Sequence, residues 1–137
     1  DRPANVFVAG FVGTPPINLW PATIDADHTV RVDGVELATT SAGSTRSGGS
    51  CVTVGVRPES VRLVTVDEPG IAATVGWVED LGHEHVVGGA LATGASFAVR
   101  WPGERKPPGR GAEVRVCPDP AHLHWFDPST GERIPWP

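Results

Sequence analysis

The chain has 137 residues, 39% of them apolar, which fits one domain with its own core. No stretch approaches the roughly 18 consecutive apolar residues of a membrane-spanning helix. The net charge is −5, and the ten arginines and one lysine are scattered, which excludes a basic groove for nucleic acid. The two cysteines are too few for a zinc ribbon or a disulfide scaffold, so we expect two reduced thiols.

The first predicted element is a short helix over residues 3–12. Pro3 suits a first helical turn, and apolar residues such as Phe7 and Phe11 fall at helical spacing. The apolar stripe is wide for so short a helix, so we expect the helix to belong to a preceding domain. The chain begins at Asp1 and contains no methionine, which also indicates a piece of a longer protein.

A β-hairpin is predicted over residues 29–37. Apolar and polar residues alternate on both sides of Asp33-Gly34, a dipeptide that favours a two-residue type I′ turn. The predicted register places Val32 opposite Val35, Arg31 opposite Glu36 in an ion pair, and Val30 opposite Leu37. Residues 39–50 are rich in serine, threonine and glycine and are predicted to form a loop.

Further strands are predicted where β-branched residues alternate with polar ones. They span residues 51–56, 61–66, 71–78, 84–91, 96–101, 113–117 and 121–126. Turn-forming residues mark segments 67–70, 88–89, 102–111 and 127–131. Phe97 and Val99 alternate with Ala98, which predicts one buried and one wet face. Short strands at this spacing are typical of an antiparallel barrel or sandwich, and closure into a small barrel would hide the strand edges.

Two His-x-His pairs are the candidates for a metal site. They are His83 with His85 and His122 with His124. On a strand, each pair would project both imidazoles from one face, so two neighbouring strands would offer four nitrogen ligands. The alternative is that they are surface or strand-edge histidines, because the motif arises readily by chance. The chain has no GxSxG elbow and no recognisable cysteine–histidine frame, so its residues predict no catalytic site.

Four segments, in order, carry a resemblance to a known family. They are Arg2–Asn18 (RPANVFVAGFVGTPPIN), Val54–Glu59 (VGVRPE), Val78–Glu84 (VEDLGHE) and Ala121–Arg133 (AHLHWFDPSTGER). With these segments the chain resembles, over nearly its whole length, the carboxy-terminal regulatory domain of bacterial ABC importer ATPases of the maltose, multiple-sugar and glycerol-phosphate type. Four motifs in the right order are more specific than any one, because each alone is a short run of common residues.

The resemblance implies an all-β domain with an OB-fold-type antiparallel β-barrel, the transport-associated (TOBE) fold. Residues 1–16 would be the end of an ATPase domain with its linker helix, and residues 17–137 the regulatory and dimerisation domain. Such a domain does not hydrolyse ATP and holds no cofactor, and ATP and Mg²⁺ would bind the missing ATPase domain. The implied partners are its own ATPase domain, a second copy of the subunit, permease subunits and a regulatory protein, with no nucleic acid. The implied location is the cytoplasmic side of the bacterial inner membrane.

The same motifs imply which residues meet a partner or a regulator. These residues are Arg57, Glu59, Leu81, Glu84, His124 and Asp127. Arg57 and Glu59 would form ion pairs across the barrel or to a partner, or else a buried turn staple within one subunit. Phe126 is expected to pack inward and Asp127 to start the closing turn. Two alternatives stay open, a small oxyanion sensor and a metal site at the histidines, since related transport-associated folds bind oxyanions such as molybdate or sulfate.

Overall fold

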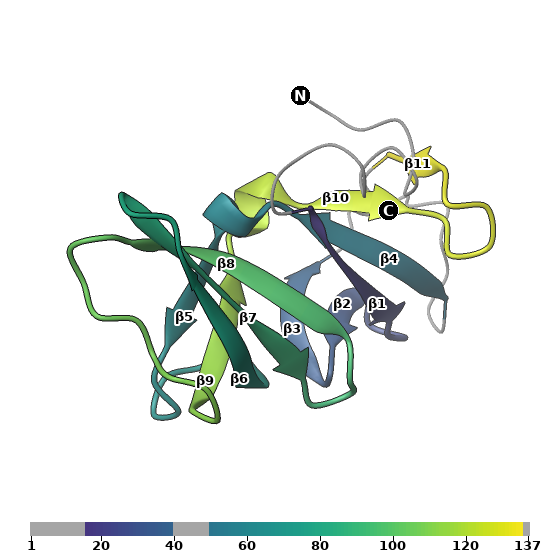
Figure 1. Ribbon diagram of the computed structural model, residues 1–137. Helices are drawn as coiled ribbons and strands as arrows, with labels where there is room; N and C mark the ends of the chain where they lie inside the picture. Colours follow the sequence, from purple (N-terminus) through teal and green to yellow (C-terminus); the bar gives the residue numbers. More distant parts are fainter. Residues whose placement is uncertain (1–15, 40–49, 136–137) are drawn as a thin grey trace.

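The structure is a computed structural model that describes residues 16–39 and 50–135 (Figure 1). In this part the strands are β1 (Asn18–Ile24), β2 (Thr29–Val32), β3 (Val35–Thr39), β4 (Cys51–Val56), β5 (Val61–Val64), β6 (Ile71–Asp80), β7 (Glu84–Leu91), β8 (Ser96–Pro102), β9 (Glu113–Pro118), β10 (His124–Phe126) and β11 (Arg133–Ile134). Two 3-10 turns, η1 (Pro58–Ser60) and η2 (Pro120–His122), follow β4 and β9. None of the helical segments described is long and apolar enough to cross a bilayer. The helix predicted over 3–12 and most of the loop predicted over 39–50 lie outside the described residues.

The strands form two antiparallel sheets, which confirms the predicted all-β class. One sheet has six strands in the order β11-β10-β4-β1-β2-β3, and the other has five in the order β5-β9-β6-β7-β8. The two sheets occupy opposite ends of the molecule in Figure 1. Closure of the strands into a single barrel stays a prediction, because the ladders define two separate sheets.

Most of the predicted strands are present, with small shifts at their ends. The segments predicted over 51–56 and 84–91 coincide with β4 and β7. The strand predicted over 121–126 is only partly correct. The observed strand, β10, begins at His124, and the residues before it form η2. Asp119 stabilises this turn, because its Oδ1 accepts a hydrogen bond from the Ala121 amide at 3.0 Å.

The turn predicted at Gly88-Gly89 is wrong, because both glycines lie in the middle of β7. Gly88 is opposite Trp77 of β6, and a Cβ on Gly88 would stand 2.1 Å from the indole ring. A Cβ on Gly89 would stand 2.0 Å from the Thr74 carbonyl oxygen. The glycines therefore serve close approach between two strands rather than a change of direction.

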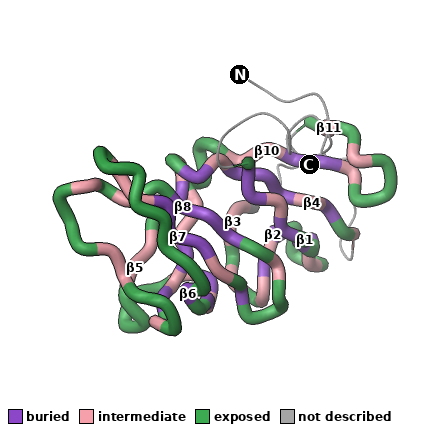
Figure 2. Tube along the Cα trace, in the orientation of Figure 1, coloured by how far each residue is buried: buried purple, intermediate pink, exposed green. Residues whose placement is uncertain are grey.

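The core lies between the sheets, where Figure 2 shows most of the buried segments. Burial alternates along β1 and turns Trp20, Ala22 and Ile24 inward. The fully buried side chains also include Phe97, Phe126, Ile71 and seven valines, and each contributes about 1.5–3 kcal/mol relative to exposure. The expectation that Phe126 packs inward is confirmed, since it lies against Ile17 and Leu19.

Asn18 is a buried polar residue that ties the two sheets together. Its Oδ1 accepts a hydrogen bond from the Ala98 amide of β8 at 2.7 Å. Its Nδ2 donates to the Ala98 carbonyl at 2.9 Å and to the Val56 carbonyl at the end of β4 at 3.1 Å. The prediction that Ala98 faces solvent is wrong, because Ala98 is buried beneath β1. Trp20 adds a second tie between the sheets, since its Nε1 donates to the Ser96 carbonyl at 2.8 Å.

The predicted hairpin over β2 and β3 is present, with one error in register. Asp33 and Gly34 have φ of 51° and 79°, as a type I′ turn requires. The pairs Val32 with Val35 and Arg31 with Glu36 are confirmed. A bulge after Val30 shifts the ladder, so that Val30 lies opposite Ala38 instead of Leu37. The Arg31 guanidinium forms its ion pair with Asp25, which raises the arginine pKa, and not with Glu36 as predicted.

Candidate functional site

Five of the six residues predicted to meet a partner or a regulator fall in three places on the described surface, and Asp127 lies outside them. The first, which we call the basic pocket, is lined by Arg57, Ser60, Ala121, His122, Leu123, His124 and Arg133. The second is an ionic cluster of Glu59, Glu84 and Arg100. The third is the hairpin tip between β6 and β7, where Trp77, Val78 and Leu81 are exposed.

The basic pocket draws its side chains from separate parts of the chain. Arg57 lies between β4 and η1, where Pro58 is buried and starts the 3-10 turn. Two histidines come from η2 and β10, and Arg133 comes from β11. The strands are brought together because β10 pairs with β4 on one edge and with β11 on the other. The VGVRPE motif and the closing motif therefore meet around one hollow.

Within the pocket, His124 is held in a defined hydrogen-bonding state. Nη1 of Arg133 lies 2.9 Å from Nδ1 of His124. A guanidinium only donates, so Nδ1 must accept, and the proton of the neutral ring is on Nε2. The other histidine of the pocket, His122, is held by a carboxylate, because its Nδ1 lies 3.0 Å from Oδ2 of Asp119. The Ala121 amide and His122 together lower the pKa of Asp119 below its ordinary value.

Asp127 lies next to the pocket but forms the closing turn, as predicted. Its Oδ1 accepts hydrogen bonds from the amides of Ser129 and Thr130 at 2.7 Å and 3.0 Å. The Gly131 amide donates to the Asp127 carbonyl at 2.8 Å, and Gly131 has a φ of 74°. This carboxylate positions β11, and hence Arg133, rather than lining the pocket.

The ionic cluster brings together two of the predicted residues. Nε of Arg100 lies 4.0 Å from Glu59, and its Nη1 lies 3.7 Å from Glu84. The groups are partly exposed and the distances are long, so each pair contributes less than about 1 kcal/mol. Sequence analysis missed Arg100, although its place on the polar face of a predicted strand marked it as exposed.

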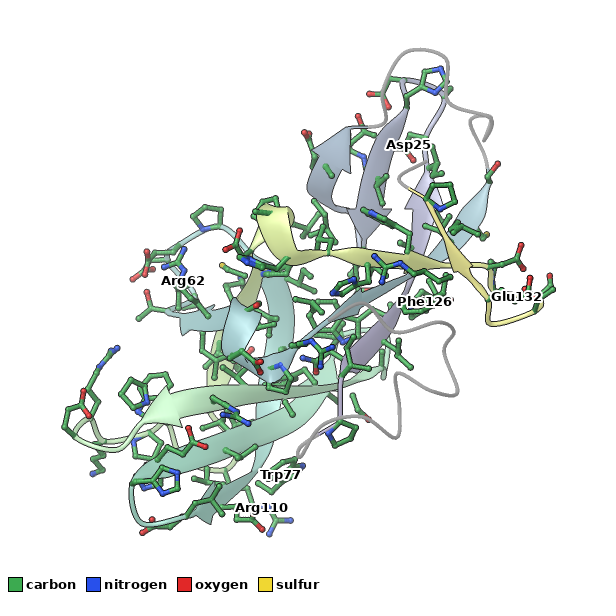
Figure 3. The ribbon with its side chains drawn as sticks, turned by 90° about the horizontal axis from the view of Figure 1, so that it is seen from above. Asp25, Arg62, Trp77, Arg110, Phe126 and Glu132 are labelled. Atoms are coloured by element: carbon green, nitrogen blue, oxygen red, sulfur yellow. The ribbon has the colours of Figure 1, made fainter. Side chains whose placement is uncertain are left out.

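The hairpin tip exposes apolar side chains on a short piece of chain, with Trp77 and Val78 on opposite faces of β6. Trp77, Val78 and Leu81 are 46%, 37% and 42% exposed. The tip has a fixed shape, because the Gly82 amide donates to Oδ1 of Asp80 at 2.8 Å. Figure 3 shows Trp77 at one end of the molecule, away from Phe126. The tip and the basic pocket are therefore separate surfaces.

The histidines do not gather into a metal centre. His83 lies in the turn before β7 and His122 lies in η2, so the prediction that each pair projects from one strand face is wrong. The two pairs also belong to different sheets. Among the described residues no three His, Cys, Asp or Glu side chains are placed to hold a metal ion. Each histidine instead lies near a charged side chain of its own neighbourhood, such as Asp80 at 3.8 Å from His85.

Comparison with known proteins identifies the family of this fold. A family model described as the TOBE domain matches residues 54–126, and one described as the MalK OB fold domain matches residues 13–61. The chain belongs to the TOBE domain family. The TOBE match covers the basic pocket apart from Arg133, together with the ionic cluster and the hairpin tip.

Two similar proteins are named as ATP-binding proteins of an import or uptake system. The TOBE chain is 39% identical over 134 residues to the sn-glycerol-3-phosphate import ATP-binding protein UgpC of Cereibacter sphaeroides, covering 98% of this chain and 36% of that protein. It is 37% identical over 155 residues to the diacetylchitobiose uptake system ATP-binding protein MsiK of Streptomyces coelicolor, covering 98% and 40%. The chain thus spans well under half the length of these relatives, and it corresponds to their carboxy-terminal TOBE and OB-fold region.

One solved structure supports the fold assignment. The cytoplasmic molybdate-binding protein ModG, in a form with molybdate bound, superposes with a TM-score of 0.59 and 17% identity. The match covers 81% of this chain and 96% of ModG. At this identity the similarity shows that the two chains share a fold.

Proposed function

We propose that the TOBE chain is the regulatory and dimerisation domain of the ATP-binding subunit of an ABC importer for a sugar or a glycerol phosphate. The observation that carries this proposal is the similarity to import ATP-binding proteins along 98% of the chain. In this role the domain does not hydrolyse ATP. The ATPase domain of the parent protein binds ATP and Mg²⁺, and the parent sits against permease subunits on the cytoplasmic side of the inner membrane.

The domain's task is to keep two ATPase subunits together while their ATPase domains open and close. A second copy of this chain is the partner, and the hairpin tip is the contact that fits it best. Three of the four large apolar side chains that are most exposed in the described residues lie within this one hairpin. Exposed large apolar side chains gathered in one hairpin favour an association surface. The ionic cluster lies beside the tip, because Glu84 begins β7 directly after the hairpin turn, and it then offers weak, adjustable pairs to a regulator.

Sedimentation velocity over a wide range of concentrations tests the proposal. We expect a concentration-dependent dimer built from chains of 14.4 kDa. Leu81→Asp introduces a charge at the centre of the contact and is expected to raise the dimer dissociation constant at least about tenfold.

The matched control is Val66→Asp, because Val66 is also exposed, at 47%, but lies outside the hairpin. This variant is expected to dimerise like the wild type. A strict monomer at every concentration, or equal weakening by both substitutions, would contradict the proposed contact.

A further inference from the structure

The five-stranded sheet has a groove between its two end strands. β5 and β8 lie at opposite ends of the strand order β5-β9-β6-β7-β8, and both line one hollow of about 760 Å³. Ligand sites commonly measure about 300–1,000 Å³. The hollow, which we call the edge groove, is lined by residues 61–65, 99–102 and 105–108 together with Glu59, Glu68 and Val114.

The β5 wall of the edge groove offers an open strand edge. The Asp119 amide donates to the Ser60 carbonyl at 2.8 Å, and the ladder continues with Arg62 opposite Cys117. Because antiparallel partners alternate, the backbone N–H and C=O groups of Leu63 point away from β9 and toward the groove. No strand in the described part of the chain forms a ladder with this edge. An extended peptide can pair with such an edge as an added strand.

The edge of β8 has fewer backbone groups to offer. The Ser96 carbonyl accepts a hydrogen bond from Nε1 of Trp20 at 2.8 Å. The amide and the carbonyl of Ala98 both bond to the side chain of Asn18. These contacts tie β8 to β1. A peptide in the groove is therefore expected to pair with β5, while β8 contributes side chains.

The floor of the edge groove is apolar and has a fixed shape. Val99 and Val114 are buried, and Leu63 and Trp101 are half-buried against the core. The Trp101 ring is held in place, because its Nε1 donates to the Arg105 carbonyl at 3.1 Å and the Arg105 guanidinium lies 4.8 Å from the ring centroid. Side chains alternate along a strand, so every second residue of a peptide paired with β5 would face this floor.

The charges around the edge groove favour an acidic partner. Four of the chain's eleven lysine and arginine residues line it, although the chain as a whole carries a charge of −5. Arg100 is paired with acidic residues in the ionic cluster. Arg62 and Lys106 form no ion pair with a described residue. Outside the ionic cluster, the wall therefore has three cations and one carboxylate, that of Glu68.

We propose that the edge groove binds an extended acidic segment of a partner protein, which adds a strand to β5. Apolar side chains of the segment pack on Leu63 and Trp101, and the aspartate or glutamate side chains between them meet Arg62 and Lys106. Main-chain hydrogen bonds give such a complex its affinity, and the alternating side chains and complementary charges give it specificity. The proposal goes beyond the proposed function, because it requires neither the dimer nor the hairpin tip.

The test is a titration of the whole ¹⁵N-labelled chain with the peptide acetyl-EVELEV-amide, followed by NMR. We expect saturable shifts at residues 61–65 and at the indole N–H of Trp101. Amide hydrogen exchange then identifies the added strand. The Leu63 amide, which points into the groove, should exchange at least about tenfold more slowly at saturation, whereas the Arg62 amide, already bonded to β9, should not change.

Two control peptides separate strand pairing from charge. Acetyl-EVEPEV-amide keeps all three carboxylates but has a proline in place of leucine, which removes a backbone N–H, so we expect binding at least about tenfold weaker. Acetyl-KVKLKV-amide keeps the apolar residues and reverses the charge, and we expect no saturable shifts.

Arg62→Glu reverses the charge of an exposed side chain at the groove and is expected to weaken binding of acetyl-EVELEV-amide at least about tenfold. Arg110→Glu is the matched control, because Arg110 is also exposed but does not line the groove. Figure 3 shows Arg110 beside Trp77 and away from Arg62. This variant should bind the peptide like the wild type.

Three results would overturn the proposal: an unprotected Leu63 amide at saturating peptide, equal binding of the proline peptide, or equal weakening by Arg62→Glu and Arg110→Glu. Protection of Leu63 that rises with protein concentration in the absence of peptide would show that a second copy of the chain covers β5, and it would also overturn the proposal. The outcome is separate from that of the dimer test, because Trp77, Val78 and Leu81 do not line the edge groove.

Discussion

The basic pocket and the hairpin tip are built in opposite ways. The tip is one continuous stretch of β6 and β7, whose apolar residues sit within a few positions of one another. The pocket needs η1, η2, β10 and β11, which come from distant parts of the chain. Its geometry therefore depends on how the six-stranded sheet is assembled, whereas the tip depends on its own two strands. Substitutions that loosen the assembly should disturb the pocket and spare the tip.

A substitution of Asn18 should have the largest effect, and it tests whether the pocket and the tip depend on different parts of the fold. Asn18→Leu keeps the volume but leaves the Ala98 amide and the Val56 carbonyl without their hydrogen bonds, and Val56 directly precedes Arg57. We expect the free energy of unfolding in urea to fall by roughly 2–4 kcal/mol. Dimerisation through the tip should persist under conditions where the variant is folded.

Thr23→Val on the same strand is the control for Asn18→Leu. Thr23 is exposed, so its loss should change stability by less than about 0.5 kcal/mol. If folded Asn18→Leu loses dimerisation, the tip depends on the assembly of the six-stranded sheet as well as on its own two strands.

A substitution of Gly88 is the converse test, because it changes the hairpin locally and leaves the six-stranded sheet intact. In Gly88→Ala the new Cβ collides with the Trp77 ring, which must move away from β7. We expect a loss of about 1–2 kcal/mol of stability and increased quenching of tryptophan fluorescence by acrylamide, because the displaced ring is more exposed.

Gly76→Ala is the matched control on the same hairpin. A Cβ on Gly76 would meet Gly89 at 3.4 Å, an ordinary contact distance. Equal losses in the two variants would show that the strands, and not the Trp77 ring, limit the space at Gly88.

Asp119 gives the smallest effect, a dependence on pH at the rim of the pocket. Its pKa is lowered in the folded chain by the Ala121 amide and by His122, so its charged form contributes stability above the ordinary value of 3.8. That contribution is lost as pH falls through the lowered pKa. Asp119→Asn keeps an oxygen acceptor for the cap but removes the charge. The wild type should therefore be slightly more stable than the variant at pH 7 and should lose that advantage below pH 3.8 in thermal unfolding.

A constant difference between the wild type and Asp119→Asn from pH 7 to pH 2 would show that the charge plays no part.

The strand pattern was predictable where local chemistry decides it. A type I′ turn needs positive φ at both central positions, and Asp33-Gly34 together with the flanking alternation of apolar and polar residues predicted the hairpin of β2 and β3. The bulge after Val30 was not predictable, because nothing in the local pattern marks it. No strand was predicted at β1, which contains Pro21, a residue type that is unfavourable inside a sheet. Its neighbour β2 pairs only with Thr23 and Ile24, so one side of β1 is open at Pro21, where a residue without an N–H is tolerated.

The candidate site also divides into features that the sequence predicted and features that it did not. The motifs predicted Arg57 and His124 as functional positions, but not that they share a hollow with Arg133, and they gave no sign of Arg100 between Glu59 and Glu84. A motif reports which residues occur in order along the chain. It does not report which strands pair across the sheet.

The sequence by itself determined the all-β class, the turns that need particular backbone angles and the motifs that mark the family. These follow from properties of neighbouring residues, such as side-chain alternation and the freedom of glycine. The tertiary structure alone decided the two-sheet arrangement, the tie at Asn18, the glycines beneath Trp77 and the meeting of cations in the basic pocket. Those features depend on contacts between residues far apart in the chain, where packing and hydrogen bonding override local preference.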